Sequence, residues 1–296
     1  MMDERERRAR IGLAAAGLSG DYGCWDRVRA EGAEQAWEKA LAGEHSPKLA
    51  LRLKNVDVDE VLRDTDRIGA RIIVPGDPEW PQGLNDLAQE DDDGIGGEPL
   101  CLWVIGDLGS CLATPSVAVV GARASTAYGE LVASRLAAGI AGEGHAVVSG
   151  GAYGIDASAH RSALGVGGKT VAVMASGLDK LFPPGNLQLL NLIGEVGALV
   201  SEQPPGSPPS RPGFLARNRL IAAMSQAMVV VEGAQRSGAQ NSARWASMLS
   251  RPLLAVPGPV TSPMSFLPHK LIREGRAILA GDAEDVLAAL VDGMRP

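Results

Sequence analysis

From residue 117 onward, short apolar runs alternate with segments of helical periodicity. The strand-like runs are Val117–Val120, Ala146–Val148, Thr170–Met174, Ala198–Val200, Met228–Val231, Leu253–Val256 and Ala277–Leu279. Between most of them lie the predicted helices Tyr128–Ala141, Asp156–Leu164, Leu187–Ile193, Asn218–Ser225 and Ala239–Leu249. Nearly continuous apolar strands that alternate with helices predict an α/β fold with a mostly parallel, doubly wound sheet covered on both faces. Right-handed crossovers then place the carboxyl ends of these strands along one edge.

The first 68 residues have another pattern, in which short helical segments are separated by glycines. The predicted helices are Arg7–Ala16, Cys24–Ala30, Ala33–Leu41 and Val58–Arg67. Strand patterns follow at 71–74 and 100–105, and the acidic stretch 91–97 between them is expected to be a flexible loop. We therefore predict a small all-helical domain (1–68), a linker and sheet extension (69–114), and a larger α/β domain (115–296).

Composition narrows the class of protein. The 296 residues, 45% of them apolar, are enough for a buried core. No apolar run approaches the ~20 residues of a membrane span, and the charged segment Met1–Arg8 lacks the apolar centre of a signal peptide. We therefore expect a cytoplasmic protein with no membrane partner. Cys24, Cys101 and Cys111 fit no disulfide or zinc pattern, so we expect neither a structural metal nor a cofactor.

The net charge of −7 argues against a nucleic-acid partner, but the charges are unevenly distributed. Residues 1–114 carry 13 basic and 23 acidic side chains, whereas residues 115–259 carry 11 basic and 7 acidic side chains. An acidic half joined to a basic core is an asymmetry that bears on partners. It supports a polyanionic partner only if the arginines converge on one site.

Two glycine-rich turns follow successive predicted strands. The first is Gly121–Arg123, and the second, Ser149–Asp156, contains Gly150, Gly151 and Gly154. Glycine adopts positive φ angles and allows close backbone approach to a ligand, and a helix N-terminus beyond the turn offers unpaired N–H groups. Two such turns at one sheet edge indicate a site for a polyphosphate, a nucleotide or a nucleic-acid backbone. The alternative is that the glycines only close short loops.

Three side chains on the same edge suit a nucleic-acid strand. The Arg123 guanidinium can hold a phosphate through two hydrogen bonds. In the loop after the strand 170–174, a base could stack on Phe182 while Lys180 neutralises its phosphate. The alternatives are a solvated surface arginine and an aromatic side chain that fills the core.

Other candidates lie near helix starts. Arg217 and Arg219 are two positions apart and diverge by about 200° on a helix, so at most one should face the ligand. The Ser237–Gly238 turn leads into a further helix, and Asn186 is expected to cap the helix that follows it.

Asp156 and His160 lie on one face of a predicted helix and allow two interpretations. They could form a metal pair or include a general base, but the sequence shows no third ligand. An aspartate at a helix start usually caps the helix or complements its dipole. We therefore favour a capping Asp156 and a His160 that is hydrogen-bonded in the core.

Seven blocks of sequence, taken in order, resemble the DNA-processing protein A family (DprA, also called Smf). The blocks are Gly121–Arg123, Ser149–His160, Gly177–Asn186, Ser201–Pro204, Phe214–Ile221, Val230–Ala239 and Ala255–Gly258. The resemblance covers about 117–275 and extends more weakly to Arg71–Leu87. Seven ordered blocks do not recur by chance, so the resemblance is specific.

The resemblance implies an extended Rossmann-like domain that binds single-stranded DNA without sequence preference. It also implies a homodimer, not an enzyme, that protects incoming DNA and loads the RecA recombinase in natural transformation. The helical N-terminus is similar in position to the family's small SAM-like domain. Motif correspondence and the glycine turns together indicate these DNA- or phosphate-binding residues: Gly121, Arg123, Ser149, Gly150, Gly151, Gly154, Lys180, Phe182, Asn186, Arg217, Asn218, Arg219, Ser237 and Gly238.

The chain also departs from the family pattern. Ala122 replaces the usual serine of the first block, and Ala239–Ser242 replaces a Ser-Leu-Ile-Thr run. Phe266–Pro268 stands where a glycine-containing turn is common. These changes affect the far end of the expected groove. We also expect no C-terminal winged-helix domain of the kind that many relatives have.

Two other functions compete with DNA binding. Rossmann-like families resembling the cytokinin-activating phosphoribohydrolases use an arginine and a glutamate on nucleoside monophosphates, and Glu202 or Glu232 beside Arg219 could serve in such an enzyme or in a nucleotide sensor. The G-G-x-G-T-x-x-E pattern of those enzymes is missing. The other alternative is a degenerate scaffold that only dimerises and binds partners.

Overall fold

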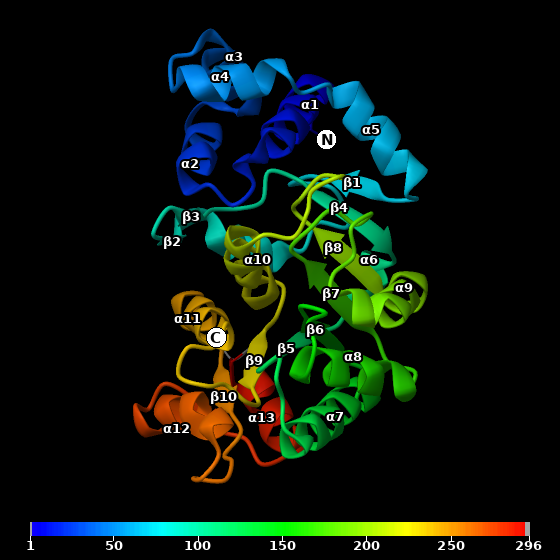
Figure 1. The fold of residues 1–296 in the computed structure, drawn as a ribbon, viewed down its shortest axis with the longest axis vertical. Coiled ribbons are helices and arrows are strands. Elements are labelled where there is room, and N and C mark those ends of the chain that lie inside the picture. The colour runs from blue at the N-terminus through cyan, green and yellow to red at the C-terminus, as the bar shows by residue number, and fades with distance from the viewer. Residues whose placement is uncertain (1, 294–296) are drawn as a thin grey trace.

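One mixed sheet forms the centre of the α/β region in the computed structural model, which describes residues 2–293 (Figure 1). Its strand order is β1-β4-β8-β7-β6-β5-β9-β10-β11. The strands are β1 (Arg71–Ile73), β4 (Leu102–Gly106), β5 (Ser116–Val120), β6 (Ala146–Ser149), β7 (Thr170–Met174), β8 (Ala198–Ser201), β9 (Ala227–Val230), β10 (Leu253–Ala255) and β11 (Ile278–Leu279). Neighbours from β8 to β11 are parallel, whereas β4 is antiparallel to both β1 and β8. The predicted mostly parallel α/β fold is confirmed.

Helices cover both faces of the sheet because successive strand residues point to opposite sides. In β5, Val117 and Val119 pack with α7, α8 and α13, whereas Ala118 and Val120 pack with α10, α11 and α12. The helices are α6 (Leu108–Cys111), α7 (Ala127–Gly142), α8 (Ile155–Gly165), α9 (Leu187–Val196), α10 (Arg211–Ala223), α11 (Ala239–Met248), α12 (Phe266–Arg273) and α13 (Ala283–Gly293). Three short 3₁₀ helices add to them: η2 (Gln82–Gln89), η3 (Pro184–Asn186) and η4 (Pro263–Ser265).

Five further helices precede the sheet and lie at the end of the molecule opposite α12 (Figure 1). They are α1 (Glu4–Leu13), α2 (Tyr22–Glu31), α3 (Ala33–Ala42), α4 (Pro47–Lys54) and α5 (Val58–Arg67), with a π-helical segment, Ala14–Leu18, after α1. Their apolar faces share one core with β4 and α9. In this core Trp103 is fully buried, and its indole N–H donates to Thr65 Oγ1 at 2.9 Å. The domain boundaries after residues 68 and 114 stay predictions.

Prolines lie in the first turns of two helices, one of which starts earlier than predicted and one of which was not predicted. Helix α10 begins at Arg211 rather than Asn218, and α4, which was not predicted, begins at Pro47. Pro212 and Pro47 occupy first turns, where the missing N–H would have no helical partner in any case. Serines complete both starts: Ser210 Oγ accepts from the Gly213 N–H at 3.1 Å, and Ser46 caps α4 in the same way. Helix α12 was also not predicted.

The acidic stretch 91–97 is a β-hairpin, so the prediction of a flexible loop is wrong. Strands β2 (Asp91–Asp92) and β3 (Ile95–Gly96) pair antiparallel. Asp91 Oδ1 accepts from the Gly94 N–H at 2.7 Å, and Gly94 has the positive φ of 80° that such a turn requires. Backbone bonds from Tyr22 and Gly96 then tie the hairpin to the region of α2.

Several classes of feature are absent from residues 2–293. No helix there is both long enough and apolar enough to cross a bilayer. No group of three or more His, Cys, Asp or Glu side chains in that range could hold a metal ion. The three cysteines are buried and unpaired.

Replacing Trp103 tests whether this side chain anchors the helical region to the sheet. We expect Trp103→Ala to lower the free energy of unfolding by about 3–5 kcal/mol, since it leaves a large cavity. Leu51→Ala is the control, because Leu51 is 63% exposed on α4 and should change stability by less than about 0.5 kcal/mol. Urea denaturation measures both values, and equal small effects would contradict the assignment.

Candidate nucleic-acid interface

The candidate site lies where the strand order reverses. From β5 the chain adds β6, β7 and β8 on one side, then crosses to place β9 on the other side of β5. In open α/β sheets such a switch point leaves a crevice at the carboxyl ends of the strands. Here the crevice is a hollow of about 400 Å³, and its walls come from five segments: residues 120–124 at the end of β5, the turn 152–156 after β6, residues 214–221 of α10, residues 234–242 at the start of α11, and Met264 of η4.

The two glycine turns touch each other at the floor of this hollow. The Ile155 N–H, at the start of α8, donates to the Ala122 carbonyl at 3.3 Å. A side chain on Gly121 would overlap Ile155, so this glycine permits the contact. Gly151 and Gly154 have φ angles of 67° and 74°, which explains why glycines occupy these positions. Glycine therefore serves here to bring two backbone turns together.

The Ser149–Asp156 turn is already occupied by a carboxylate of the chain itself. Asp156 Oδ2 accepts hydrogen bonds from the Gly150 N–H at 3.1 Å and from the Ala152 N–H at 3.3 Å. The side chain is 6% exposed, and burial raises its pKa, an effect that the nearby Arg217 charge opposes. The Gly150 N–H, chosen as a phosphate-binding group, is thus bonded to a side chain of the same chain. Asp156 takes the place that the sequence suggested for a ligand anion.

Arg217 is the buried positive charge opposite Asp156. Its guanidinium donates to the Val173 carbonyl at 2.5 Å and lies so close to Gly150 that a Cβ on that glycine would overlap it. Burial lowers the pKa of Arg217 to about 10, although the Asp156 carboxylate acts in the other direction. Both Arg217 and Asp156 line the hollow. The Arg217 side chain is thus held in position from the strand side and from the glycine turn.

An arginine and two aromatic rings form the rim. The Arg123 guanidinium carbon lies 4.5 Å from the centre of the Phe214 ring, a cation–π geometry. Phe182 lies against Phe214, with ring centres 5.9 Å apart and an angle of 55° between the planes. A second hollow, of about 630 Å³, begins at these three residues and extends along Pro209–Arg211.

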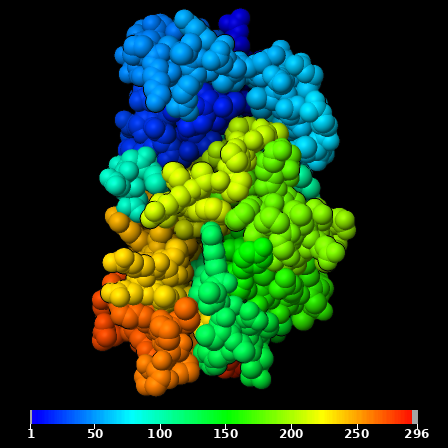
Figure 2. All heavy atoms as spheres, viewed as in Figure 1, coloured from blue at the N-terminus to red at the C-terminus, as the bar shows by residue number. Residues whose placement is uncertain are grey.

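The two hollows form one continuous groove, because both are lined by Arg123, Phe214, Leu215, Arg236, Ser237 and Gly238. We call the joined hollows the groove. Figure 2 views the face where its walls meet, between the green turn near residue 123, the yellow-green segment before α10, and the yellow α11. Its lining includes four arginines, Arg123, Arg211, Arg217 and Arg236, and one acidic side chain, Asp156. The groove therefore suits an anionic ligand.

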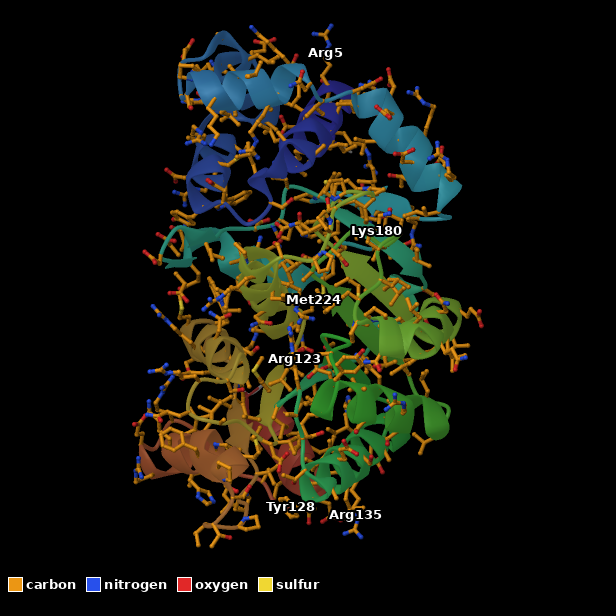
Figure 3. The ribbon with its side chains drawn as sticks, in the orientation of Figure 1. Arg5, Arg123, Tyr128, Arg135, Lys180 and Met224 are labelled. Carbon is orange, nitrogen blue, oxygen red and sulfur yellow. The ribbon has the colours of Figure 1, made fainter. Side chains whose placement is uncertain are left out.

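The other residues predicted to bind DNA differ in whether they line the groove. Ser237 and Gly238 line the groove, and Asn218 lines its inner part. Lys180 is exposed, but it lies apart from Arg123 (Figure 3) and 3.9 Å from the Asp179 carboxylate. Lys180 is not among the lining residues, so the structure does not bring it together with the arginines.

Two polar predictions are structural rather than exposed. Ser149 is fully buried, and its hydroxyl donates to the Val119 carbonyl at 2.7 Å. Asn186 is 2% exposed, and its amide donates to the Gly151 and Ala152 carbonyls at 3.0 and 3.1 Å. Neither side chain is among the lining residues of the groove, so the structure does not bring them together with the arginines. They hold the glycine turn from two sides.

Arg219 does not line the groove, although it was chosen with Arg217 as a DNA-binding residue. It is fully buried, and its two terminal nitrogens donate to the Glu202 carboxylate at 2.8 and 2.6 Å. Its Nε donates to the Gly97 carbonyl at 3.2 Å. The divergence expected from helix spacing is present: Arg217 lines the groove, while Arg219 points into the protein toward the β2–β3 hairpin.

Other residues have structural partners that account for them. Glu232 accepts from the Thr126 N–H at 2.9 Å and from its hydroxyl at 2.6 Å, so it stabilises the start of α7. His160 is fully buried, with Nδ1 2.7 Å from Thr170 Oγ1, as the packing interpretation expects. Asp156 lies in the first turn of α8, but its carboxylate binds the preceding turn.

Sequence reasoning did not choose three residues that line the groove. Phe214 lies inside a matched block, yet only Arg217, Asn218 and Arg219 of that block were chosen. Arg211 is the first residue of α10, Arg236 lies in the turn that leads into α11, and both are exposed on the groove. The sequence held a signal for both arginines, since each lies at or just before a helix start at the carboxyl edge of the sheet.

Removing one member of the Arg219–Glu202 pair should destabilise the protein more than removing both. Arg219→Leu should lower the free energy of unfolding by about 3–5 kcal/mol, because it leaves Glu202 buried without a partner. Adding Glu202→Leu should restore a large part of the loss. Arg67→Leu is the control, since Arg67 pairs with Asp64 while 72% exposed and should cost less than about 1 kcal/mol. Equal losses in the single and double variants, measured by urea unfolding, would contradict this account.

His160 predicts a pH dependence of stability. Burial lowers its pKa to about 3, and Arg217 and Arg161 add to the effect. In the unfolded state the His160 pKa is about 6.5, so the imidazole binds a proton there that it does not bind in the native state. The free energy of unfolding therefore falls as pH decreases from about 6.5 toward 3. The slope contributed is at most about 1.4 kcal/mol per pH unit. His160→Gln should show a shallower fall in chemical denaturation across this range; an unchanged slope would contradict the prediction.

Comparison with known proteins identifies the family. The family model for DNA recombination-mediator protein A matches residues 71–291. The chain is 45% identical over 272 residues to a Mycobacterium tuberculosis protein provisionally named DNA processing protein DprA. This match covers 88% of this chain and 69% of the relative. It is 38% identical over 205 residues to DNA processing protein DprA of Streptococcus pneumoniae, covering 69% of this chain and 72% of that one.

Solved structures agree with this result. The X-ray structure of DprA from Streptococcus pneumoniae superposes with a TM-score of 0.80 at 29% identity and covers 97% of this chain and 98% of that chain. A Helicobacter pylori DprA structure, which concerns that protein's single-stranded DNA binding mode, gives a TM-score of 0.65 at 27% identity and covers 75% of this chain and 96% of that one. The protein therefore belongs to the DNA processing protein A (DprA/Smf) family.

Proposed function

We propose that the protein binds single-stranded DNA without sequence preference, and that the strand lies in the groove. The observation that carries this proposal is the Arg123–Phe214–Phe182 cluster on the rim. Exposed aromatic faces beside guanidinium groups allow a base to stack while its phosphate is neutralised. Because every base has a π-face, stacking of this kind is tolerant of sequence. The Helicobacter pylori relative, whose structure concerns single-stranded DNA binding, supports the same class of ligand.

We propose that phosphates contact the exposed arginines and not the glycine turn. Arg123, Arg211 and Arg236 are exposed on the groove, whereas the Gly150 N–H is already bonded to Asp156. Arginine forks bind phosphate oxygens through paired hydrogen bonds. The glycine turn then acts by shaping the floor and holding Arg217.

The biological role that we propose follows from the family. The protein would protect incoming DNA and load RecA in the cytoplasm during transformation and recombination, acting as a homodimer without catalytic activity of its own. The family name, DNA recombination-mediator protein A, supports the recombination part of this role.

Phosphoribohydrolase-like chemistry is the weaker alternative. Its candidate glutamates both have structural partners: Glu202 is paired with Arg219, and Glu232 binds Thr126. Glu202 and Glu232 are each 3% exposed, so neither carboxylate is presented to a ligand in the groove. Incubation with AMP, followed by analysis for released base, tests this alternative directly.

The groove assignment predicts losses of affinity for an oligo-dT strand. Phe214→Ala should cost about 1–3 kcal/mol of binding free energy for a stacked base. Arg123→Ala should weaken binding severalfold and lower the slope of log K against log salt by about 0.7, as expected for one lost phosphate contact on a single strand. Fluorescence anisotropy at several salt concentrations measures both changes.

Arg135→Ala is the matched control, since Arg135 is an exposed arginine on α7, far from Arg123 (Figure 3). It should leave the affinity and the salt slope nearly unchanged. Equal affinities for the wild type, Phe214→Ala and Arg123→Ala would rule out the groove as the binding site. Failure of the wild type to bind any single strand would rule out the proposed function.

A further inference from the structure

A third hollow continues from the groove around the start of α11. It has a volume of about 310 Å³ and is lined by Ser237, Gln240, Asn241, Arg244 and Arg276. Ser237 also lines both parts of the groove, so the hollows meet at this residue. Every side chain that lines the third hollow is polar or positively charged. This composition suits a hydrated, anionic ligand and not an apolar one.

Hydrogen bonding connects the third hollow to the groove. Asn218, which lines the inner part of the groove, donates from its amide to Asn241 Oδ1 at 3.1 Å. Asn241 lines the third hollow from the side of α11. The polar surface therefore continues beyond the groove.

The two arginines of the third hollow have partners of different strength. Arg244, 59% exposed, lies 2.7 Å from a carboxylate oxygen of Asp92, whose side chain is 11% exposed. Asp92 belongs to β2 of the acidic hairpin, so a segment distant in sequence reaches across to α11. Arg276 makes only a loose pair with Glu274, at 3.8 Å with both side chains about two-fifths exposed. Such an exposed pair contributes little and leaves Arg276 able to bind another anion.

We propose that Arg244 and Arg276 form a second phosphate subsite, at which single-stranded DNA leaves the groove, and that Asp92 competes with the DNA phosphate for Arg244. The inference rests on the proposed function, because it extends the path of the same strand. A strand lying on Arg123 and passing Ser237 meets these guanidinium groups next. The Asp92 carboxylate then occupies, in the free protein, the position of a phosphate oxygen.

Strand length separates this subsite from the groove. A strand of about six nucleotides should fill the groove alone, and one of about twenty should also reach the subsite. Arg276→Ala should lower the salt slope for the long strand by about 0.7 and leave the short strand unaffected. Arg273→Ala is the matched control, since Arg273 is exposed three residues earlier and lines a different hollow. Arg276 has only a loose surface partner, so its variant should fold normally.

Replacing Asp92 tests the competition for Arg244, because this variant should strengthen DNA binding rather than weaken it. Asp92→Asn should strengthen binding of the long strand by about twofold to fivefold, since it releases Arg244 from a pair in which the arginine is exposed to solvent. Asp93→Asn is the control, because it makes the same charge change on the same hairpin at a residue that is exposed. In an Arg244→Ala background, Asp92→Asn should lose its effect, because the two residues act on the same contact.

The outcomes distinguish the two proposals. A length-dependent slope change in Arg276→Ala, with Asp92→Asn stronger than Asp93→Asn, supports the subsite. Normal binding of both strands by the wild type, with the Arg276→Ala slope unchanged for the long strand, overturns the subsite and leaves the groove intact. Equal gains in Asp92→Asn and Asp93→Asn overturn the competition by Asp92. No binding of either strand by the wild type overturns the proposed function itself.

Discussion

The Asp156 carboxylate is the internal anion around which the floor of the groove is organised. It binds the Gly150 and Ala152 N–H groups and faces the Arg217 guanidinium from within a buried environment. Arg217 in turn is bonded to the end of β7 and lies against Gly150. The carboxylate therefore closes the turn after β6, and Arg217 of α10, on the other face of the sheet, lies against Gly150 of the same turn. The Asp156 charge opposes the effect of burial on the Arg217 guanidinium, which would otherwise be a more costly buried charge.

This arrangement determines which groups remain for a ligand. The Gly150 and Ala152 N–H groups are bonded to Asp156, and Ser149 and Asn186 brace the same turn. Positive charge toward solvent therefore comes from long side chains on the rim, where Arg123 rests on Phe214. Guanidinium groups on flexible stems can follow an irregular strand, whereas a rigid cradle would fix one phosphate. The design suits a ligand with many phosphates and varied bases.

Much of the fold could be predicted from the sequence, because strand and helix periodicities are local. The run Val117–Val120 and its successors indicated the parallel sheet and its ligand-binding edge. Helix spacing also predicted that Arg217 and Arg219 would diverge, but it could not say which one faces the groove. Which arginine faces the groove depends on Glu202, a tertiary partner that accepts hydrogen bonds from both terminal nitrogens of Arg219. The predicted helices included neither Pro47 nor Pro212, although both prolines occupy first turns of helices.

The use of Gly150 shows the limit of motif reasoning in physical terms. A glycine turn before a helix is compatible with a bound phosphate or with an internal carboxylate, and both satisfy the same N–H groups. Only the structure shows that the Asp156 carboxylate accepts hydrogen bonds from the N–H groups of the preceding turn. Phe214 shows the converse case, since an aromatic residue is compatible with core or rim until its contact with Arg123 is seen.

A crystal structure with a bound oligo-dT strand would test the central claim most directly. The account predicts phosphate oxygens within hydrogen-bond distance of the Arg123 and Arg236 guanidinium groups, a base on the Phe214 ring, and Asp156 still bonded to the Gly150 N–H. A phosphate seated on the Gly150 N–H with Asp156 displaced, or a strand bound away from the groove, would contradict it.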